Sequence, residues 1–294
     1  DVYKRQGGYD ETAQFQVTSE DLGDPFVIGP GISAAWFDPS RNGEGFMLEV
    51  LENNQAVMYW FTYDTEGNQD WYVAQGEVRG NRILFPELLQ VSGGEFGSGF
   101  DPAKVSNKVV GSASFIWSDC NTGAMDWVID QDGNGRRSGR MDLRRLSYVM
   151  GFDCGLSPIP PEIPAGQLSG SWYDPSHAGE GYVLEVLFDS QVLVYWFSFD
   201  AEGNRRWFFG IGEIQDDKLV FSDMLTTSGG IFGDGFDPAS VEVKPWGALE
   251  LELVCDSGTA DFVPTEEGFP AGSLDLDRLT HLSGLSCESP AQGK

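Results

Sequence analysis

The chain has 294 residues and carries 46 Asp and Glu against 18 Lys and Arg, which gives a formal charge of −28. This charge argues against nucleic acid and anionic membrane surfaces as partners, because both attract basic patches. The 38 glycines, the 13% aromatic residues and the lack of any apolar run near about 18 residues indicate a turn-rich β protein without membrane insertion.

The first 30 residues are expected to lie outside the folded domains. Residues 1–6 match the translation of an adapter used to prepare sequencing libraries, so we interpret them as a scar on a fragment of environmental DNA. The native start is then missing, and the tail that follows is interpreted as the remnant of a lost upstream domain. The lack of a signal peptide therefore carries no information on location.

An internal duplication organises the rest of the chain. Residues 36–105 match residues 172–241, and about half of the aligned positions are identical. The match predicts two homologous domains at 31–156 and 165–288. Between them, the proline-rich segment 157–164 is typical of an extended linker, and 289–294 form a C-terminal tail.

Short β-rich runs follow one another within each copy at the spacing of an all-β meander. Asp64–Asn68 and Asp200–Asn204 are predicted hairpin turns in which Gly takes the positive-φ position. Eight antiparallel strands predict an up-and-down barrel, which leaves no exposed edge, with a β-sandwich as the alternative. The strands expected in the first copy are 32–37, 45–52, 55–63, 69–78, 82–91, 108–118, 123–130 and 138–147.

Two sequence motifs occur once in each copy. The motif W-[FY]-D-P-x3-G-E-G-[FY] begins at Trp36 and Trp172, and Y-W-F-[TS]-[YF]-D-x2-G-N-x2-W begins at Tyr59 and Tyr195. Together they resemble a repeat found in uncharacterised secreted proteins of Gram-negative bacteria. The resemblance covers both copies, implies export and a modular β domain, and transfers no catalytic residue.

A Trp near the start and an Arg near the end of each copy resemble the Trp–Arg closure of lipocalin-like barrels. The pairs are Trp36 with Arg145 and Trp172 with Arg278. We therefore expect the first and last strands of each barrel to meet at these residues.

Each copy contains two cysteines, and pairing within a copy is the simplest of the three connectivities. It predicts the disulfides Cys120–Cys154 and Cys255–Cys287. Two disulfides imply an oxidising compartment, so the protein is expected to be secreted, periplasmic or cell-surface. The alternative is four unpaired buried thiols.

The candidate catalytic residues are glutamates present in both copies, Glu49 with Glu77 and Glu185 with Glu213. Alternation places Glu49 on the strand face of apolar neighbours, where burial raises a carboxyl pKa unless the group is paired. A second carboxylate such as Glu77 would then complete an acid–base pair of the glycosidase type. The alternative, which we favour, is a structural ion pair with Arg145 or Arg278, or a solvated strand face.

Aromatic residues shared by the copies are the candidate ligand-binding set. Flat aromatic rings bind sugars and other planar apolar ligands, while nearby acids bond the hydroxyls. The alternative is that most of these rings fill the barrels and the interface between the domains. The candidates are Trp60, Tyr63, Trp71, Trp196, Phe199 and Trp207.

Asp130, Asp132 and Asn134 form the first half of a calcium loop, so Ca²⁺ is the one cofactor considered. The twelfth position is Met141 instead of Glu, and a plain acidic turn is the favoured alternative. The Gly-rich segments 92–102 and 228–238 lack the Lys and the helix of a phosphate loop. We expect them to form a fixed loop at one end of each barrel.

The sequence favours a secreted tandem binding or adhesion module for a carbohydrate or another envelope or extracellular component. Two sites on a short linker would gain avidity through effective concentration. The alternatives are a hydrolase that uses the paired glutamates and a structural spacer of a larger extracellular protein.

Overall fold

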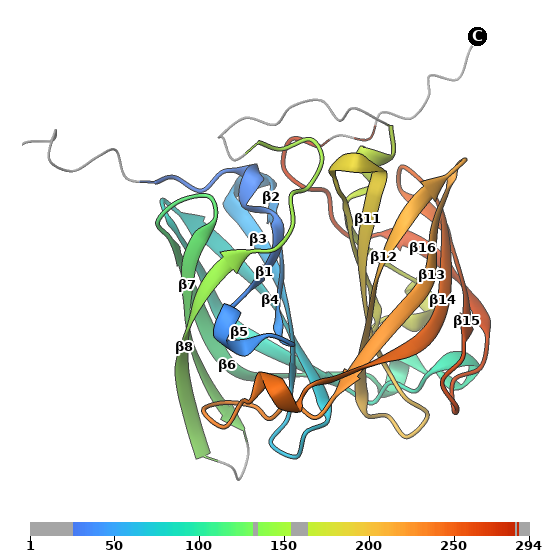
Figure 1. Cartoon of the computed structure of the whole chain (residues 1–294), viewed down its shortest axis with the longest axis horizontal. Coiled ribbons are helices and arrows are strands. Elements are labelled where there is room, and N and C mark those ends of the chain that lie inside the picture. Colours follow the sequence, from blue (N-terminus) through green and yellow to red (C-terminus); the bar gives the residue numbers. More distant parts are fainter. Residues whose placement is uncertain (1–25, 132–134, 154–163, 286, 288–294) are drawn as a thin grey trace, which may run out of the picture.

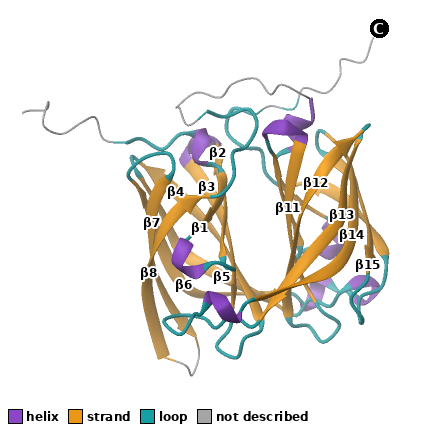
Figure 2. Ribbon diagram, in the orientation of Figure 1, coloured by secondary structure: helices purple, strands orange, loops and turns teal. Residues whose placement is uncertain are grey.

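The chain folds into two closed antiparallel β-barrels that stand side by side (Figure 1). The computed structural model describes residues 26–131, 135–153, 164–285 and 287. Strands β1–β8 close the first barrel and β9–β16 the second, so the barrel prediction is confirmed and the sandwich alternative is wrong. In this part of the chain, helix is confined to short 3₁₀ turns between strands (Figure 2). No helix among these residues is long and apolar enough to cross a membrane.

The strands of the first barrel fall on the eight predicted runs, with ends that differ by a few residues. They are β1 (Ala34–Phe37), β2 (Gly45–Leu51), β3 (Gln55–Tyr63), β4 (Gln69–Arg79), β5 (Arg82–Ser92), β6 (Ser106–Trp117), β7 (Thr122–Gln131) and β8 (Gly135–Arg145). The second barrel comprises β9 (Gly170–Tyr173), β10 (Gly181–Val186), β11 (Gln191–Phe199), β12 (Arg205–Gln215), β13 (Lys218–Ser228), β14 (Glu242–Val254), β15 (Ser257–Pro264) and β16 (Gly272–Arg278).

Each barrel closes at the predicted Trp–Arg pair. Trp36 of β1 pairs with Arg145 of β8, and Trp172 of β9 pairs with Arg278 of β16. The guanidinium carbons lie 4.8 Å and 5.4 Å from the centroids of the indole rings, within the range of a cation–π contact. Arg145 also donates to the carbonyl of Gly31 at 2.6 Å, which ties the closing strand to the turn before β1.

Both faces of the central strands are aromatic, and both are covered. Trp60 points into the first barrel, while Phe61 on the outer face packs against the second barrel. The outer faces of β2–β4 and β10–β12 thus form one apolar layer between the barrels. Phe61 stacks on Tyr195 across this layer with the ring centroids 4.4 Å apart. The run Tyr-Trp-Phe in each copy therefore fills a core on one side and an interface on the other.

The two Gly-rich segments cross from one barrel to the other. Figure 1 shows the teal segment after β5 beneath the second barrel and the orange segment after β13 beneath the first. Phe96 enters the interior of the second barrel, and Phe232 enters the interior of the first. Each core is therefore completed by an aromatic ring from the other copy. The rings that contact these two phenylalanines include Trp60, Tyr72, Trp127, Trp196, Trp246 and Phe262.

Two glycines allow these loops to approach the aromatic interface. A Cβ atom on Gly94 would lie 2.2 Å from the ring of Phe199, and one on Gly230 would lie 2.2 Å from the ring of Tyr63. No real Cβ contact is that short, so a side chain at either position would displace the loop. The loops were expected at barrel ends, and this close packing explains why both copies retain the Gly-Gly pair.

The segment that follows the last strand of each barrel also packs against the other barrel. The amide of Met150 donates to the carbonyl of Val186 at 2.7 Å, and the amide of Ser283 donates to the carbonyl of Val50 at 2.9 Å. Leu282 and Leu285 of the second copy pack with Val149 of the first. The contacts come in matched pairs, as expected for two copies related by a pseudo-twofold axis.

One predicted disulfide is seen directly. Cys255 and Cys287 are bonded, which confirms that pairing. Cys120 is also in a disulfide, and Cys154, its predicted partner, lies outside the described residues. The adapter-like start, most of the linker 157–164 and the tail 289–294 lie outside them too.

Replacing both Cys255 and Cys287 with serine should lower the free energy of unfolding by about 3–4 kcal/mol, because the bond closes a loop between residues 32 positions apart. Urea denaturation of the variant and the wild type, followed by circular dichroism, measures the difference. An unchanged midpoint would show that the disulfide does not stabilise the second barrel.

Candidate functional site

The six predicted ligand-binding aromatics are all buried. Trp60 and Trp196 lie inside the barrels against the exchanged phenylalanines. The other four, Tyr63, Trp71, Phe199 and Trp207, lie in the apolar layer between the barrels. None of them is an open platform on the outer surface, and most of their ring area is used in packing.

Two grooves flank the apolar layer, and they are related by the pseudo-twofold axis. Groove 1 has a volume of about 300 Å³ and groove 2 a volume of about 500 Å³, within the range of small-molecule sites. Groove 1 is lined by Tyr59, Trp71, Val73, Val91, Asn107, Ser171, Trp172, Tyr173, Ala178, Gly179, Glu180, Gly181, Tyr182, Phe197 and Leu279. Groove 2 is lined by Phe37, Pro39, Asn42, Gly43, Glu44, Phe61, Leu146, Tyr195, Trp207, Phe209, Thr227, Pro238, Val241 and Val243.

Most lining positions correspond between the copies. Trp71 of groove 1 corresponds to Trp207 of groove 2, so two of the predicted aromatics reach the groove walls. The rims carry exposed apolar side chains, with Leu279 55% exposed at groove 1 and Leu146 53% exposed at groove 2. The grooves are therefore apolar and aromatic, and each has an open edge.

Each groove contains a buried glutamate that is already paired. Glu44 in groove 2 forms an ion pair with Arg41 and accepts a hydrogen bond from Thr62. Glu180 in groove 1 bonds the Nδ1 atom of His177 at 2.7 Å and accepts a hydrogen bond from Ser198. Burial raises the pKa of Glu44, and the Arg41 charge opposes that rise. These carboxylates position the turns at the groove entrances.

The partners of these glutamates are held by the exchanged loops. The Arg41 guanidinium lies 4.6 Å from the ring centroid of Phe236, and the His177 ring stacks on Phe100 with 4.6 Å between centroids. The hydrogen bond to Glu180 raises the pKa of His177. One entrance therefore carries a permanent cation and the other a titratable one.

The glutamates predicted to pair within each copy are not brought together. Glu49 is buried between the barrels, whereas Glu77 has a side chain 51% exposed and an ion pair with Arg79. Glu213 is also exposed. β3 separates the strands of Glu49 and Glu77. The predicted pairs, Glu49 with Glu77 and Glu185 with Glu213, are therefore not acid–base pairs of the glycosidase type.

Glu49 crosses the interface to the second copy. Its carboxylate accepts hydrogen bonds from the hydroxyls of Ser171 and Thr280, both at 2.7 Å. The Ser171 hydroxyl also lies 2.8 Å from the hydroxyl of Tyr59, and both of these residues line groove 1. Burial raises the pKa of Glu49 to about 7, opposed by the two hydroxyls and by the Arg278 charge.

Glu185 occupies the matching position and has fewer partners. Burial raises its pKa to about 7, opposed by a hydrogen bond from Ser147 and by the Arg145 charge. The Oε2 atom has no hydrogen-bond partner within the part of the chain that the structure describes. The predicted arginines are thus near both glutamates, but in the described part of the chain their guanidinium groups bond backbone carbonyls and not these carboxylates.

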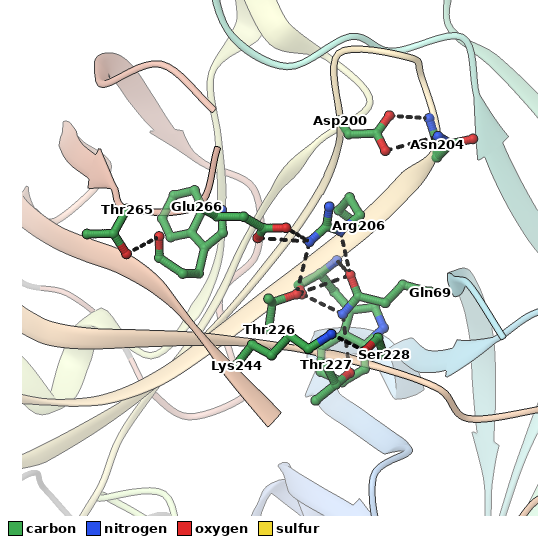
Figure 3. Close-up of polar contacts among 12 residues, drawn as sticks. Gln69, Asp200, Asn204, Arg206, Thr226, Thr227, Ser228, Lys244, Thr265 and Glu266 are labelled. Carbon is green, nitrogen blue, oxygen red and sulfur yellow. Dashed lines mark hydrogen bonds and ion pairs between the residues drawn. The ribbon is translucent and has the colours of Figure 1, made fainter. Parts of the chain in front are cut away.

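A polar network at the interface was not anticipated. The side-chain nitrogen of Gln69 donates to the carbonyl of Trp207 at 2.9 Å. The side-chain oxygen of Gln69 accepts a hydrogen bond from Nε of Arg206, also at 2.9 Å (Figure 3). Arg206 also bonds both oxygens of Glu266 at 3.0 Å. The side chain of Gln69 therefore bonds the backbone N–H and C=O of Trp207, within β12 of the other barrel.

Asp70, next to Gln69 in the sequence, is a buried acid that makes a separate contact between the copies. It forms an ion pair with Arg205 and accepts a hydrogen bond from Gln90 at 2.8 Å. Burial raises the pKa of Asp70, and the Arg205 charge opposes the rise. Gln69-Asp70 aligns with Arg205-Arg206 between otherwise similar segments. This exchange of an acid for a base is a sequence signal that could have indicated a contact between the copies, and the sequence analysis missed it.

The calcium prediction falls mostly outside the described residues. Asp130 is exposed near the end of β7, and Asp132 and Asn134 are not among the residues that the structure describes. Within the described part of the chain, no group of three or more His, Cys, Asp or Glu side chains is placed to hold a metal ion.

Comparison with known proteins adds no assignment. No protein-family model matches the chain, and no curated protein matches its sequence. The resemblance to secreted Gram-negative repeats therefore stays an expectation, and the site is interpreted from its geometry.

Proposed function

We propose that the protein is a secreted or periplasmic binding module that takes small extracellular ligands, such as carbohydrates, in the two grooves between its barrels. The observation that carries this proposal is the pair of matched aromatic grooves, each large enough for a small molecule. Trp71 and Trp207 give each groove an indole wall, which suits the apolar face of a sugar ring. The disulfides support export.

Duplication supports a two-site module. The copies bury their aromatic faces against each other, and this packing also forms both grooves. Neither groove exists in one copy alone, because each is lined by residues from both. Two sites on one chain can engage a repetitive ligand with increased avidity. The hydrolase alternative is not supported, because the two carboxylates of each copy are apart.

Titration with a panel of mono- and oligosaccharides, followed by tryptophan fluorescence, tests the proposal. Leu279→Glu and Leu146→Glu place a charge at the rims of groove 1 and groove 2, and each should weaken binding at its own groove by about tenfold or more, leaving one site of wild-type affinity. Both positions are more than half exposed, so stability should change by less than about 0.5 kcal/mol.

Val254→Glu is the matched control. Val254 is 66% exposed and lines neither groove, so this variant should bind as the wild type does. Equal loss of binding in all three variants, or saturable binding that neither rim variant weakens, would place the ligand elsewhere.

A further inference from the structure

One residue distinguishes the polar contacts beside groove 1 from those at the matching point beside groove 2. Ser171 lines groove 1, whereas Ala35 and Glu185 are buried next to Tyr195, behind the lining of groove 2. In groove 1 the Ser171 hydroxyl bridges the Glu49 carboxylate at 2.7 Å and the Tyr59 hydroxyl at 2.8 Å. The aligned residue in the first copy is Ala35, which has no hydroxyl. The backbone is the same in both places, since the amides of Ala35 and Ser171 donate to Ser147 and Thr280, each at 2.7 Å.

Ala35 therefore leaves two polar groups without the bridge that groove 1 has. The Oε2 atom of the buried Glu185 has no hydrogen-bond partner among the described residues. Tyr195, the counterpart of Tyr59, lines groove 2 and lies close enough to Glu185 for that carboxylate to raise the pKa of its hydroxyl. An unpartnered buried carboxylate oxygen is costly, and a bound donor removes that cost.

The walls around this point are aromatic. Tyr195 stacks on Phe61 with 4.4 Å between centroids and on Phe209 with 5.5 Å. Phe37 and Trp207 also line groove 2. Groove 2 also contains Glu44, whose charge is already paired with Arg41, whereas Glu185 has no ion pair among the described contacts. Aromatic faces beside such an acid favour organic cations, because the ring faces attract positive charge.

We propose that groove 2 binds the primary ammonium group of a small amine, placed between the Glu185 carboxylate and the Tyr195 hydroxyl, where Ser171 lies in groove 1. The inference rests on the proposed binding function and names the ligand class of one groove. Groove 1 does not share this preference, because Ser171 already fills the position. Ala35 is thus the residue that determines specificity.

Charge favours an ammonium group over a neutral hydroxyl. The chain carries a net charge of −28, which raises the local concentration of cations. The charged and titratable groups that face Glu185 are Arg145, Glu49 and Tyr195. Arg145 directs its guanidinium to the carbonyls of Cys120 and Gly31 and does not form an ion pair with Glu185 among the described contacts.

Isothermal titration with benzylamine, with benzyl alcohol as its neutral analogue, tests the assignment. The wild type should bind one benzylamine per chain at pH 8 and should bind benzyl alcohol at least about tenfold more weakly. Because the carboxyl of Glu185 titrates near pH 7, benzylamine affinity should rise about tenfold between pH 6 and pH 8. Equal affinity for the alcohol, or affinity independent of pH, would overturn the ammonium assignment.

Two reciprocal variants locate the site. Ala35→Ser should abolish benzylamine binding, because the serine hydroxyl takes the place of the ammonium group. Ser171→Ala should open the same position beside Glu49 and raise the stoichiometry to two. If Ala35→Ser does not fold, Glu185→Gln removes the charge with the same shape and should weaken binding by more than about tenfold. Binding that Ala35→Ser and Glu185→Gln leave unchanged would overturn the proposal.

These outcomes separate the inference from the proposed function. Saccharide binding that is blocked at the rims, together with no benzylamine binding, would leave the two-groove module standing and reject the amine. Benzylamine binding that Ala35→Ser abolishes, with no saccharide binding, would support the amine site and reject carbohydrate as the ligand.

Discussion

Replacing Phe232 with alanine should lower the free energy of unfolding by about 3–5 kcal/mol. Phe232 comes from the second copy, but its side chain completes the core of the first barrel. Its ring contacts Trp60 and Trp127 inside the first barrel and is 5% exposed. Phe96→Ala should cost a similar amount in the second barrel. The two sites lie in separate cores, so the double variant should lose about the sum. Urea denaturation followed by tryptophan fluorescence measures these changes.

Ile231 is the control for the loop itself. It precedes Phe232, is exposed, and its replacement with alanine should change stability by less than about 0.5 kcal/mol. The same exchange predicts that residues 26–153 alone do not fold cooperatively, because the first core then lacks Phe232. A stable isolated first copy, or a Phe232→Ala variant as stable as Ile231→Ala, would show that the exchanged ring does not hold the barrels together.

Glu49 and Glu185 should make the protein less stable at neutral pH than at mildly acid pH. Burial raises both pKa values from 4.5 to about 7, so the folded state binds more protons than the unfolded state between these values. Stability therefore falls as the pH rises from about 4.5 to about 7. Each group contributes about 3 kcal/mol of that loss, since one pKa unit corresponds to about 1.4 kcal/mol.

The variant with both Glu49→Gln and Glu185→Gln should be more stable than the wild type at pH 8 by about 6 kcal/mol and equally stable near pH 4. Glutamine resembles the protonated acid, so the difference between the two proteins isolates these groups. The pKa values of Glu44, Asp70 and His177 are also raised, but these groups contribute equally to the pH dependence of stability in the variant and the wild type. Denaturation midpoints measured from pH 4 to pH 8 give the result.

Glu77→Gln provides the control for this titration. Glu77 is exposed and its pKa is lowered by Arg79, so the variant should not gain stability at pH 8. A gain in Glu77→Gln as large as that of the double variant would assign the effect to net charge. A wild type whose stability is flat between pH 4.5 and pH 7 would contradict the burial of the two carboxylates as the cause.

Sequence patterns were sufficient to predict the parts of the fold that depend on pairing between strands of the same copy. Alternating apolar residues placed all eight strands of the first copy, and the glycines at Gly67 and Gly203 do take positive φ in the hairpin turns. The Trp36–Arg145 pair was visible because barrel closure joins the first and last strands of one copy. These features arise from local geometry and from pairing within a single repeat.

Period-two alternation showed that Glu49 shares a face with Met47, but it does not distinguish the inside of a barrel from an outer face that another domain covers. Both faces of β3 are aromatic, so either face was a candidate for the core. The outcome depended on packing between the copies, which gave Glu49 its partners Ser171 and Thr280 from residues over a hundred positions away.

The sequence by itself determined the duplication, the strand order, the pairing of Cys255 with Cys287 and the glutamates and aromatics worth testing. Only the tertiary structure decided that the copies exchange Phe96 and Phe232, that their aromatic faces pack together, and that the grooves form between them. The physical reason is that hydrophobic burial has no direction: an aromatic face must be covered, but its sequence does not specify what covers it.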